Sequence, residues 1–508
     1  IGVNKVFSAS NAGDVGGAVI DISSKELTEE SALAVDLSAG VNVMAINADF
    51  IRQDGSNYFG IANTDQPIKN QYSFSNSLDP KKVSFPLNHS YGISGGKLSG
   101  KGENGNTFSF FAVASHRMSY SCTEEIVRNS ISDGTVYQDQ QGDKYSQAIN
   151  QLALASAHYE IDRRHNVNYN FMLIHVNDQY VGEYSGLYSE PFQNSPSLSG
   201  IIRRQQTNDN LLLVNQIVSD WKLSPIMKLN LGAAYNTVNG LEPDRRENYF
   251  TQLNENLYGL TRSNRNKRFF SDLKNNDFNV KTAVSLKLND RFNTENSLLQ
   301  VGYAGRFVND NFKAIEYNFS PLGMPNFTME NLVLDQLFEE NLNNGLLKME
   351  TGETNSYKVF KNIHSVFAEI SYQLARNLAG NVGLRMDAVD LTVNHNVTHV
   401  APGSETINKN YLLPSLNLKY DMNDKNSLRL GISKTYTLPQ SKEISPYQYV
   451  NISFASQGNP DIKPSDNYNL DLKWDYYITN NELFSINTFY KYIQNPIGRV
   501  DQGNSAGL

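Results

Sequence analysis

The stretch NYNLDLKWDYYITNNELFSINTFYKYIQNPI, residues 467–497, alternates between apolar and polar side chains. Every second residue from Tyr468 to Ile478 is aromatic or aliphatic, and most of the residues between them are polar or charged. The alternation resumes after a pair of asparagines. A period of two is that of a β-strand whose two faces meet different surroundings. The stretch therefore predicts a hairpin with one apolar face and one polar face.

The same alternation recurs in about fifteen segments after residue 30, each of roughly the 9–11 residues that a tilted strand needs to cross a bilayer. Clear examples are residues 227–236, 278–288, 382–388 and 428–436. Repetition on this scale predicts one large all-β architecture.

The connections between these segments alternate in length. Short polar turns are predicted at residues 162–166, 288–296, 422–426 and 478–482. Much longer connections are predicted at residues 237–276, 312–356 and 439–466. Alternating short turns and long loops are typical of an outer-membrane β-barrel, whose short turns face the periplasm and whose long loops face outward.

The composition indicates what lies against the apolar faces. Only 39% of the residues are hydrophobic, yet there are 28 Tyr and 25 Phe. A soluble β-sandwich also alternates, but Val, Ile and Leu dominate its buried face, and its loops seldom reach roughly 40 residues. Aromatic residues gather toward strand ends, as in residues 473–477, which is typical of the girdles at a bilayer interface. We therefore expect the apolar faces to meet lipid and the polar faces to line a lumen.

Several other classes of protein are disfavoured. The chain has no run of roughly 18 apolar residues, which excludes a helical membrane span. The net charge of -8 argues against a nucleic-acid partner, which requires a basic surface. His395 and His399 would lie about 13 Å apart on a strand, and Cys122 has no partner cysteine. We expect no metal site, no cofactor and, because no catalytic set of residues can be assembled, no enzyme activity.

Residues 10–27, SNAGDVGGAVIDISSKEL, do not follow this strand rhythm. Asp14, Gly16 and Gly17 precede a V-I-D-I strand, and this segment resembles the end of the plug domain in TonB-dependent outer-membrane receptors. In that family the next residues enter the first barrel strand, which we expect at residues 32–43.

A second resemblance to the same family lies far downstream. A strand that ends in an aromatic residue and a proline is followed by a G-N-P loop leading to K-P-S, and then by a strand bearing F-Y-K. The G-N-P and K-P-S positions are Gly458, Asn459, Pro460 and Pro464. Prolines cannot donate to a β-ladder, so these residues are expected at strand ends or in loops.

The resemblance implies a transmembrane antiparallel β-barrel with the remnant of an N-terminal plug. We expect residues 1–28 to be the end of the plug and residues 29–508 to be the barrel. The complete barrel would have about 22 strands, so we expect further plug residues before the chain and further strands after it.

The resemblance further implies an active transporter in the outer membrane of a Gram-negative bacterium. It would bind a scarce nutrient, either a small molecule, a glycan or a peptide, and import it with energy from the TonB complex of the inner membrane. Outer-membrane lipid would surround it, and a surface lipoprotein acting as a lid is left open. The alternative is a passive porin-like or surface-binding β-barrel protein, which would have no plug.

Aromatic residues in the long connections are the candidate ligand-binding residues. We single out Tyr258, Tyr447, Tyr449 and Phe454, because aromatic rings can stack on a sugar, a porphyrin or an aryl group. The competing interpretation is that these rings pack the loops against one another, because large loops need small cores of their own.

Overall fold

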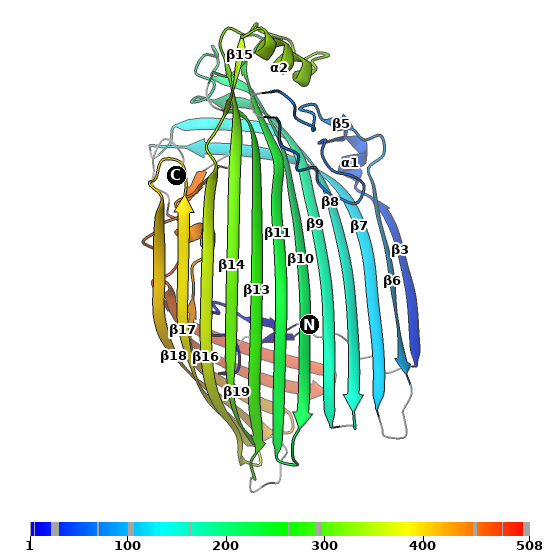
Figure 1. Ribbon diagram of the computed structural model, residues 1–508, viewed down its shortest axis with the longest axis vertical. Coiled ribbons are helices and arrows are strands. Elements are labelled where there is room, and N and C mark those ends of the chain that lie inside the picture. The colour runs from blue at the N-terminus through cyan, green and yellow to red at the C-terminus, as the bar shows by residue number, and fades with distance from the viewer. Residues whose placement is uncertain are drawn as a thin grey trace.

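A computed structural model describes residues 2–4, 6–21, 30–68, 71–99, 106–131, 133–162, 164–262, 265–289, 292, 297–450, 455–479 and 481–500. The chain folds into one large antiparallel sheet that curls into a barrel (Figure 1). Its long strands are β3 (Ser31–Val41), β6 (Leu87–Ser99), β7 (Thr107–Ser130), β8 (Val136–Ile161), β9 (His165–Tyr188), β10 (Ser199–Lys222), β11 (Met227–Gln252), β13 (Asn266–Lys287), β14 (Leu298–Pro321), β16 (Asn355–Ala375), β17 (Leu378–Asn396), β18 (Gly403–Asn423), β19 (Asn426–Thr437), β22 (Ser465–Thr479) and β23 (Glu482–Gln494).

Shorter strands and helices accompany this sheet, which is here called the wall. The short strands are β1 (Gly2–Asn4), β2 (Val19–Asp21), β4 (Ile51–Arg52), β5 (Lys81–Lys82), β12 (Tyr258–Leu260), β15 (Leu347–Thr351), β20 (Gln448–Val450) and β21 (Ala455–Gln457). The helices are α1 (Val43–Asn47), α2 (Leu334–Asn343) and α3 (Ser441–Ile444). Within the described ranges, none of the helices is long and apolar enough to cross a membrane.

The strands follow one another in a closed order around the barrel, in which β3 follows β23. Residue-by-residue pairing joins β3 to β6 and β23 to β22, and among the described residues no such register joins β3 to β23. Both strands are exposed along almost their whole length.

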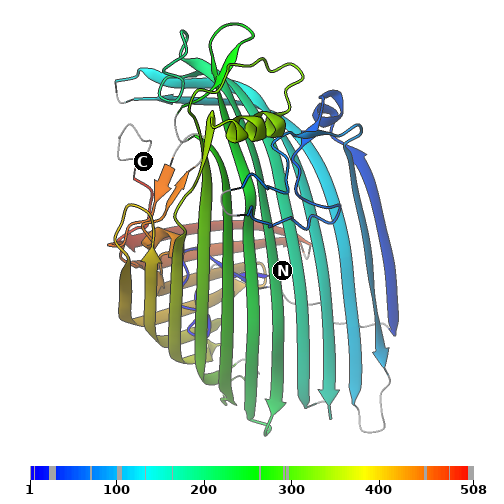
Figure 2. The same cartoon turned by 45° about the horizontal axis from the view of Figure 1, so that its top comes forward.

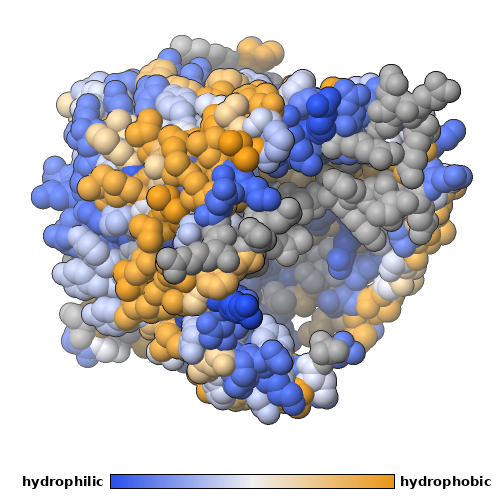
Figure 3. Space-filling view, turned by 90° about the horizontal axis from the view of Figure 1, so that it is seen from below, coloured by the Kyte–Doolittle hydropathy of each residue, from blue (hydrophilic) through white to orange (hydrophobic). Residues whose placement is uncertain are grey.

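The two faces of the strands differ as predicted. On β22, Tyr468, Leu470 and Leu472 are exposed on the outer face, whereas Asn469 is half-buried and Asp475 is buried. Viewed from below, the molecule is hollowed, and hydrophobic residues gather over one side of it (Figure 3). The first barrel strand, β3, also lies where it was expected.

The predicted long loop over residues 237–276 is wrong. β11 continues to Gln252 and β13 begins at Asn266, so most of this stretch extends the wall. Residues 242–251 are all buried, because loops cover both faces of the wall at this height. With both faces covered, the alternation of apolar and polar residues disappears, and sequence periodicity no longer reveals the strand.

The two ends of the barrel are unlike each other. The predicted short turns join β8 to β9, β13 to β14, β18 to β19 and β22 to β23. The strands of the first three pairs meet at the end drawn at the bottom of Figure 1, here called the turn end. The opposite end, here called the loop end, carries the connections that contain α1, α2 and α3 (Figure 2). The predicted asymmetry of connections is confirmed.

Candidate functional site

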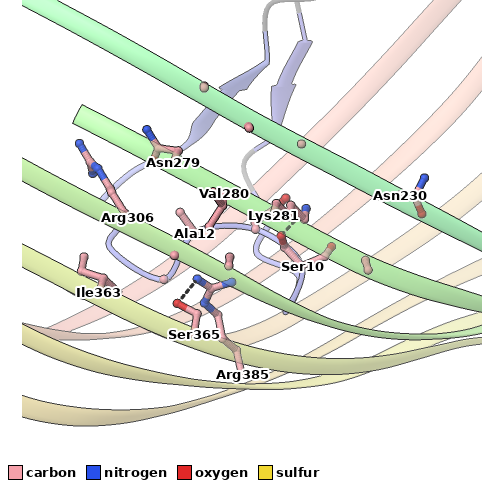
Figure 4. Close-up of a pocket in the computed structure, with 18 of the residues that line it drawn as sticks. Ser10, Ala12, Asn230, Asn279, Val280, Lys281, Arg306, Ile363, Ser365 and Arg385 are labelled. Atoms are coloured by element: carbon pink, nitrogen blue, oxygen red, sulfur yellow. Dashed lines mark hydrogen bonds between the residues drawn. The ribbon is translucent and has the colours of Figure 1, made fainter. Parts of the chain in front are cut away.

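Residues 6–17, here called the inner segment, lie against the luminal face of the wall. Wall side chains donate hydrogen bonds to the backbone carbonyls of this segment: Asn417 Nδ2 to Phe7 at 3.0 Å, Arg385 to Ala9 at 3.4 Å and Lys281 Nζ to Ser10 at 2.8 Å. Figure 4 shows Lys281 and Arg385 pointing at the inner segment from two different strands. The wall therefore holds this part of the segment largely through its backbone.

The second half of the inner segment runs beside the end of β19. The amide of Val15 donates to the Tyr436 carbonyl at 2.8 Å, and the amide of Tyr436 donates to the Gly13 carbonyl at 3.1 Å. On β23, Lys491 Nζ donates to the Gly16 carbonyl at 2.6 Å. Lys491 belongs to the F-Y-K strand of the downstream motif, so the two motifs that lie far apart in the sequence are in contact.

Close approach explains two glycines of the inner segment. A Cβ on Gly13 would clash with the Leu413 side chain, and a Cβ on Gly16 would lie 2.9 Å from Thr437 Oγ1. A Cβ on Gly17 would meet nothing within 4 Å. Gly16 of the sequence motif thus lies close to the wall, and so does Gly13, which directly precedes Asp14 and is not part of the motif.

Asp14 connects the inner segment to the loop above it. Its carboxylate accepts a hydrogen bond of 2.9 Å from the amide of Leu438, the residue that directly follows β19. Burial raises the pKa of this carboxyl group, and the nearby charges of Lys361 and Arg306 only partly offset the effect of burial. The charged form of Asp14 is therefore less stable in the docked segment than it would be in water.

The connection that begins at Leu438, residues 438–464, is here called the inner loop, and its described residues, 438–450 and 455–464, fold into the lumen. Ser441 Oγ donates to Asp310 on β14 at 2.7 Å, and Ile444 packs with Tyr357 and Val359 of β16. Gly458 lies so close to α3 that an added Cβ would clash with the Ser445 carbonyl. The G-N-P motif is thus the place where the inner loop crosses its own helix.

The other residues of that motif form the turn that follows. The amide of Asn459 donates to the Glu443 carbonyl at 2.7 Å, and the amide of Asp461 donates to the Asn459 side chain at 2.9 Å. Pro460 lies between them, and Pro464 directly precedes β22. These positions shape the turn through which the inner loop leads into β22.

The candidate ligand-binding aromatics fall into two places. Tyr447 packs on Phe312 with ring centroids 5.1 Å apart, and the Tyr449 hydroxyl donates to Glu242 at 3.1 Å. Both tyrosines therefore lie on the inner loop against the luminal face of the wall. Tyr258 instead packs in the cluster of Phe250, Phe270, Phe319 and α2 residues. Phe454 lies outside the described residues.

Tyr449 touches a buried charged cluster that sequence reasoning missed. The guanidinium of Arg245 lies 4.2 Å from the Phe269 ring and 5.5 Å from the Tyr449 ring. Glu242 and Glu247 both pair with Arg245, at 2.8 and 3.0 Å. Burial raises the pKa of Glu247, but Arg204 and Lys267, with Arg245, outweigh it and hold that pKa below its usual range. The inner loop thus rests on a fixed charged surface.

A cavity of about 590 Å³ lies beside the inner segment (Figure 4). Its lining includes Asp14, Lys281, Arg306 and Arg385. Arg306 is paired with Asp277 at 2.8 Å. A second cavity, of about 950 Å³, is lined by Arg429, Asp471 and Lys473, which are lumen-facing as predicted.

The described residues place no group of three or more His, Cys, Asp or Glu side chains where they could hold a metal ion. The contacts described above are hydrogen bonds, ion pairs and aromatic packing.

Comparison with known proteins gives one family. Residues 136–508 match the family described as TonB dependent receptor-like, beta-barrel. No curated protein gives a match.

Similar solved structures include the ferric citrate transporter FecA in its unliganded form, at 11% identity and a TM-score of 0.42, covering 83% of this chain and 50% of that one. The ferric yersiniabactin uptake receptor FyuA from Yersinia pestis has 11% identity and a TM-score of 0.45, with 92% and 60% covered. The ferric-catecholate import receptor Fiu from K12 E. coli, in its closed form, has 11% identity and a TM-score of 0.42, with 82% and 58% covered. The chain spans less than two thirds of the length of these three proteins.

Proposed function

Because the chain belongs to the TonB-dependent receptor-like β-barrel family, we propose that it is an outer-membrane transporter that imports a scarce nutrient with energy supplied through TonB. The observation that carries this proposal is the inner segment, which docks inside the barrel through its backbone and touches the inner loop through Asp14. A passive pore has no need of such a segment.

In this proposal residues 1–28 are the end of a plug domain and residues 29–508 belong to the barrel. The loop end faces the outside of a Gram-negative cell, and the turn end faces the periplasm. The apolar outer faces of the strands meet outer-membrane lipid. The TonB complex acts on the plug from the periplasm, where energy from the inner membrane can reach it.

The contacts that dock the inner segment are individually weak, which suits a segment that must move and return. A single hydrogen bond contributes only about 0.5–1.5 kcal/mol, so the contacts of Phe7, Ala9, Ser10 and Gly16 with the wall can be broken one after another by a pulling force. Phe7 adds a small hydrophobic cluster with Ile363, Val389, Tyr411, Leu413, Tyr436 and Leu438. The segment is thereby positioned strongly enough to stay docked at rest.

Asp14 couples the position of the inner segment to the position of the inner loop. Any displacement of the inner segment removes the acceptor from the Leu438 amide, which is the first residue of the inner loop. Movement of the plug on the periplasmic side therefore loosens a loop that faces the nutrient. Conversely, a ligand that orders the inner loop favours the docked segment, because binding free energies are reciprocal.

We place the nutrient above the inner segment, against Tyr447 and Tyr449, with Phe454 as a further candidate from the same loop. Tyr258 packs instead in the hydrophobic cluster around α2. The ligand class remains a small molecule, a glycan or a peptide, and a surface lipoprotein could close the vestibule from above. We infer binding and transport without catalysis.

Ion conductance in planar bilayers tests this proposal against the passive pore. The complete protein is expected to give no steady channels, because a plugged barrel conducts poorly at rest. A passive porin would give stable conductance steps at once. Stable steps from protein whose inner segment is shown by limited proteolysis to be intact would contradict the proposed transporter.

A further inference from the structure

The described part of the connection between β3 and β6, residues 42–68 and 71–86, packs on the outer face of the wall. On β10, Gln216 and Val218 line the luminal cavity, so odd-numbered residues of this strand face outward. The register of β10 with β9 continues without a shift up to Asp209 and beyond. Asp209 is one of the outward residues, and its carboxylate accepts a hydrogen bond of 2.9 Å from the amide of Ala62. Figure 1 shows this connection in front of the wall, close to α1 and β5.

Within this connection, residues 57–62 form a tight turn, here called the outer turn. The Asn57 side chain accepts hydrogen bonds from the amides of Phe59 and Ile61, at 2.9 and 3.1 Å. Gly60 has φ +77, and a Cβ there would lie 2.9 Å from the Asn177 side chain. The backbone of the outer turn is therefore pressed against the wall at Gly60, where only a glycine fits without strain.

The side chains of the outer turn are oriented by this contact. Tyr58 stacks on His116 of β7 with ring centroids 5.4 Å apart, and its hydroxyl lies 2.7 Å from His89 Nε2 of β6. Tyr58, Phe59 and Ile61 are nevertheless 51%, 50% and 61% exposed. Three large apolar side chains are thus held rigidly at the surface, although burying them would be favourable.

The height of the outer turn coincides with the edge of the apolar belt. His116 pairs with Gln151, which lies ten residues from Ile161 at the turn end of β8. Ten residues at about 3.3 Å each, on a strand tilted by about 40°, rise about 25 Å, which is the height of the apolar band of a membrane barrel. The outer turn therefore lies where the acyl chains meet the headgroups on the loop-end side.

The outward residues next to the outer turn belong to the same apolar surface. Tyr91 and Ile93 of β6 are 41% and 53% exposed, and Leu37 of β3 is 80% exposed. Phe85, just before β6, is 58% exposed. The surface of the outer turn is thus continuous with the strand faces that meet lipid, and aromatic residues are favoured at that boundary because their rings are amphipathic.

We propose that the outer turn is a lipid anchor, in which Tyr58, Phe59 and Ile61 insert into the boundary between headgroups and acyl chains on the outer side of the membrane. The proposal rests on the membrane setting proposed above. It assigns residues 42–86 to the membrane surface, where the anchor holds the connection flat against the barrel and away from the mouth of the lumen.

Quenching of tryptophan fluorescence by lipids with brominated acyl chains tests the anchor. The two native tryptophans, Trp221 and Trp474, are replaced by Phe, and Phe59→Trp is compared with Phe110→Trp and Ile126→Trp. All three reporters are exposed, and the two on β7 share the outward face of His116. Phe110 lies toward the turn end within the belt, whereas Ile126 lies ten residues above His116.

Brominated phosphatidylcholine vesicles are expected to quench Phe59→Trp and Phe110→Trp strongly and Ile126→Trp weakly. Quenching of Phe110→Trp alone would overturn the anchor while leaving the membrane setting intact, and quenching of neither would refute the membrane setting itself. Protection of Phe59→Trp from both brominated lipid and aqueous acrylamide would show a protein partner instead of lipid.

Should the tryptophan replacements prevent folding, a fluorophore on Ile61→Cys in a Cys122→Ser background gives the same comparison, with Ile126→Cys as the water-exposed control. An emission shift toward the blue in vesicles at Ile61→Cys only supports the anchor. Equal emission from both positions would overturn it.

Discussion

At the scale of single residues, Asp14 is the most informative position. It combines a buried carboxylate with one strong acceptor role, toward the Leu438 amide. Because burial raises its pKa, the docked segment binds a proton more readily than the undocked one does. The docking stability that this group contributes is therefore fully present below the ordinary pKa of an undocked aspartate and is lost as the pH rises through the raised pKa of the docked one.

Asp14→Asn is expected to strengthen docking at pH 7, because the amide keeps an acceptor oxygen without a buried charge. Asp14→Ala leaves the Leu438 amide unsatisfied and should weaken docking by about 1–3 kcal/mol. Hydrogen exchange of residues 13–16 and 436–438, corrected for intrinsic rates, measures both effects. Docking of the wild type should strengthen as the pH falls from neutral toward the ordinary pKa of an aspartate, while Asp14→Asn should show no such change. Equal protection in all three proteins would contradict the role of Asp14.

The inner-loop tyrosines are expected to affect nutrient binding more than folding. Tyr447→Ala and Tyr449→Ala should weaken binding of the transported nutrient at least tenfold, while Tyr449→Phe, which loses only the bond to Glu242, should weaken it little. Tyr258→Ala is the matched control, because Tyr258 packs in the hydrophobic cluster around α2 and not on the inner loop. Calorimetric binding and the thermal unfolding midpoint are measured together. Loss of stability without loss of affinity would show that the tyrosines only pack the loop.

At the scale of elements, the connection over residues 42–86 depends on charges buried under it. Arg268 Nε donates to Asp244 at 2.7 Å, and its guanidinium lies 3.9 Å from the Phe74 ring. Burial raises the pKa of Asp244, but Arg268 and Arg246 outweigh it, so that this pKa lies below its usual range. Burial of Arg246 among these charges lowers its pKa to about 10. The pair of Arg268 on β13 and Asp244 on β11 thus holds the connection between β3 and β6 against these two strands.

Arg268→Leu is expected to release this connection. Asp244 would keep the Asn76 amide and Arg246, whose Nε lies 3.9 Å away, and a buried charge that loses its close charged partner costs about 3–5 kcal/mol. Tryptic cleavage at Arg52 and Lys81 should become at least tenfold faster. The control is Arg128→Leu, which breaks the exposed pair with Asp139 and should change the rate little. Unchanged cleavage in Arg268→Leu would mean that apolar packing alone holds the connection.

Much of the arrangement of strands could be predicted from the sequence, and there are physical reasons why the rest could not. Alternation between lipid and lumen predicted the strands in the membrane belt, and Asp14 and Gly16 predicted a segment inside the barrel. The wall extension over residues 242–251 is buried on both faces and carries no alternation. The donors Lys281 and Lys491 could not be found, because residues so far apart in the sequence meet the inner segment only in the folded barrel.

At the scale of the whole molecule, the inner segment and the inner loop meet inside the barrel at Asp14. The inner segment is held by strands from β13 to β23, and the inner loop rests on β11, β14 and β16. We propose that this arrangement lets force on the inner segment change access through the inner loop. Energised transport is therefore the central claim.

Uptake by cells that carry the complete protein, with and without a functional TonB, tests that claim most directly. Labelled ferric chelates, cobalamin, oligosaccharides and peptides serve as the probes. The account predicts that at least one label accumulates only when both the protein and TonB are present. Accumulation that depends on the protein but is equal in the strain without TonB would contradict it, and would make the barrel a passive pore.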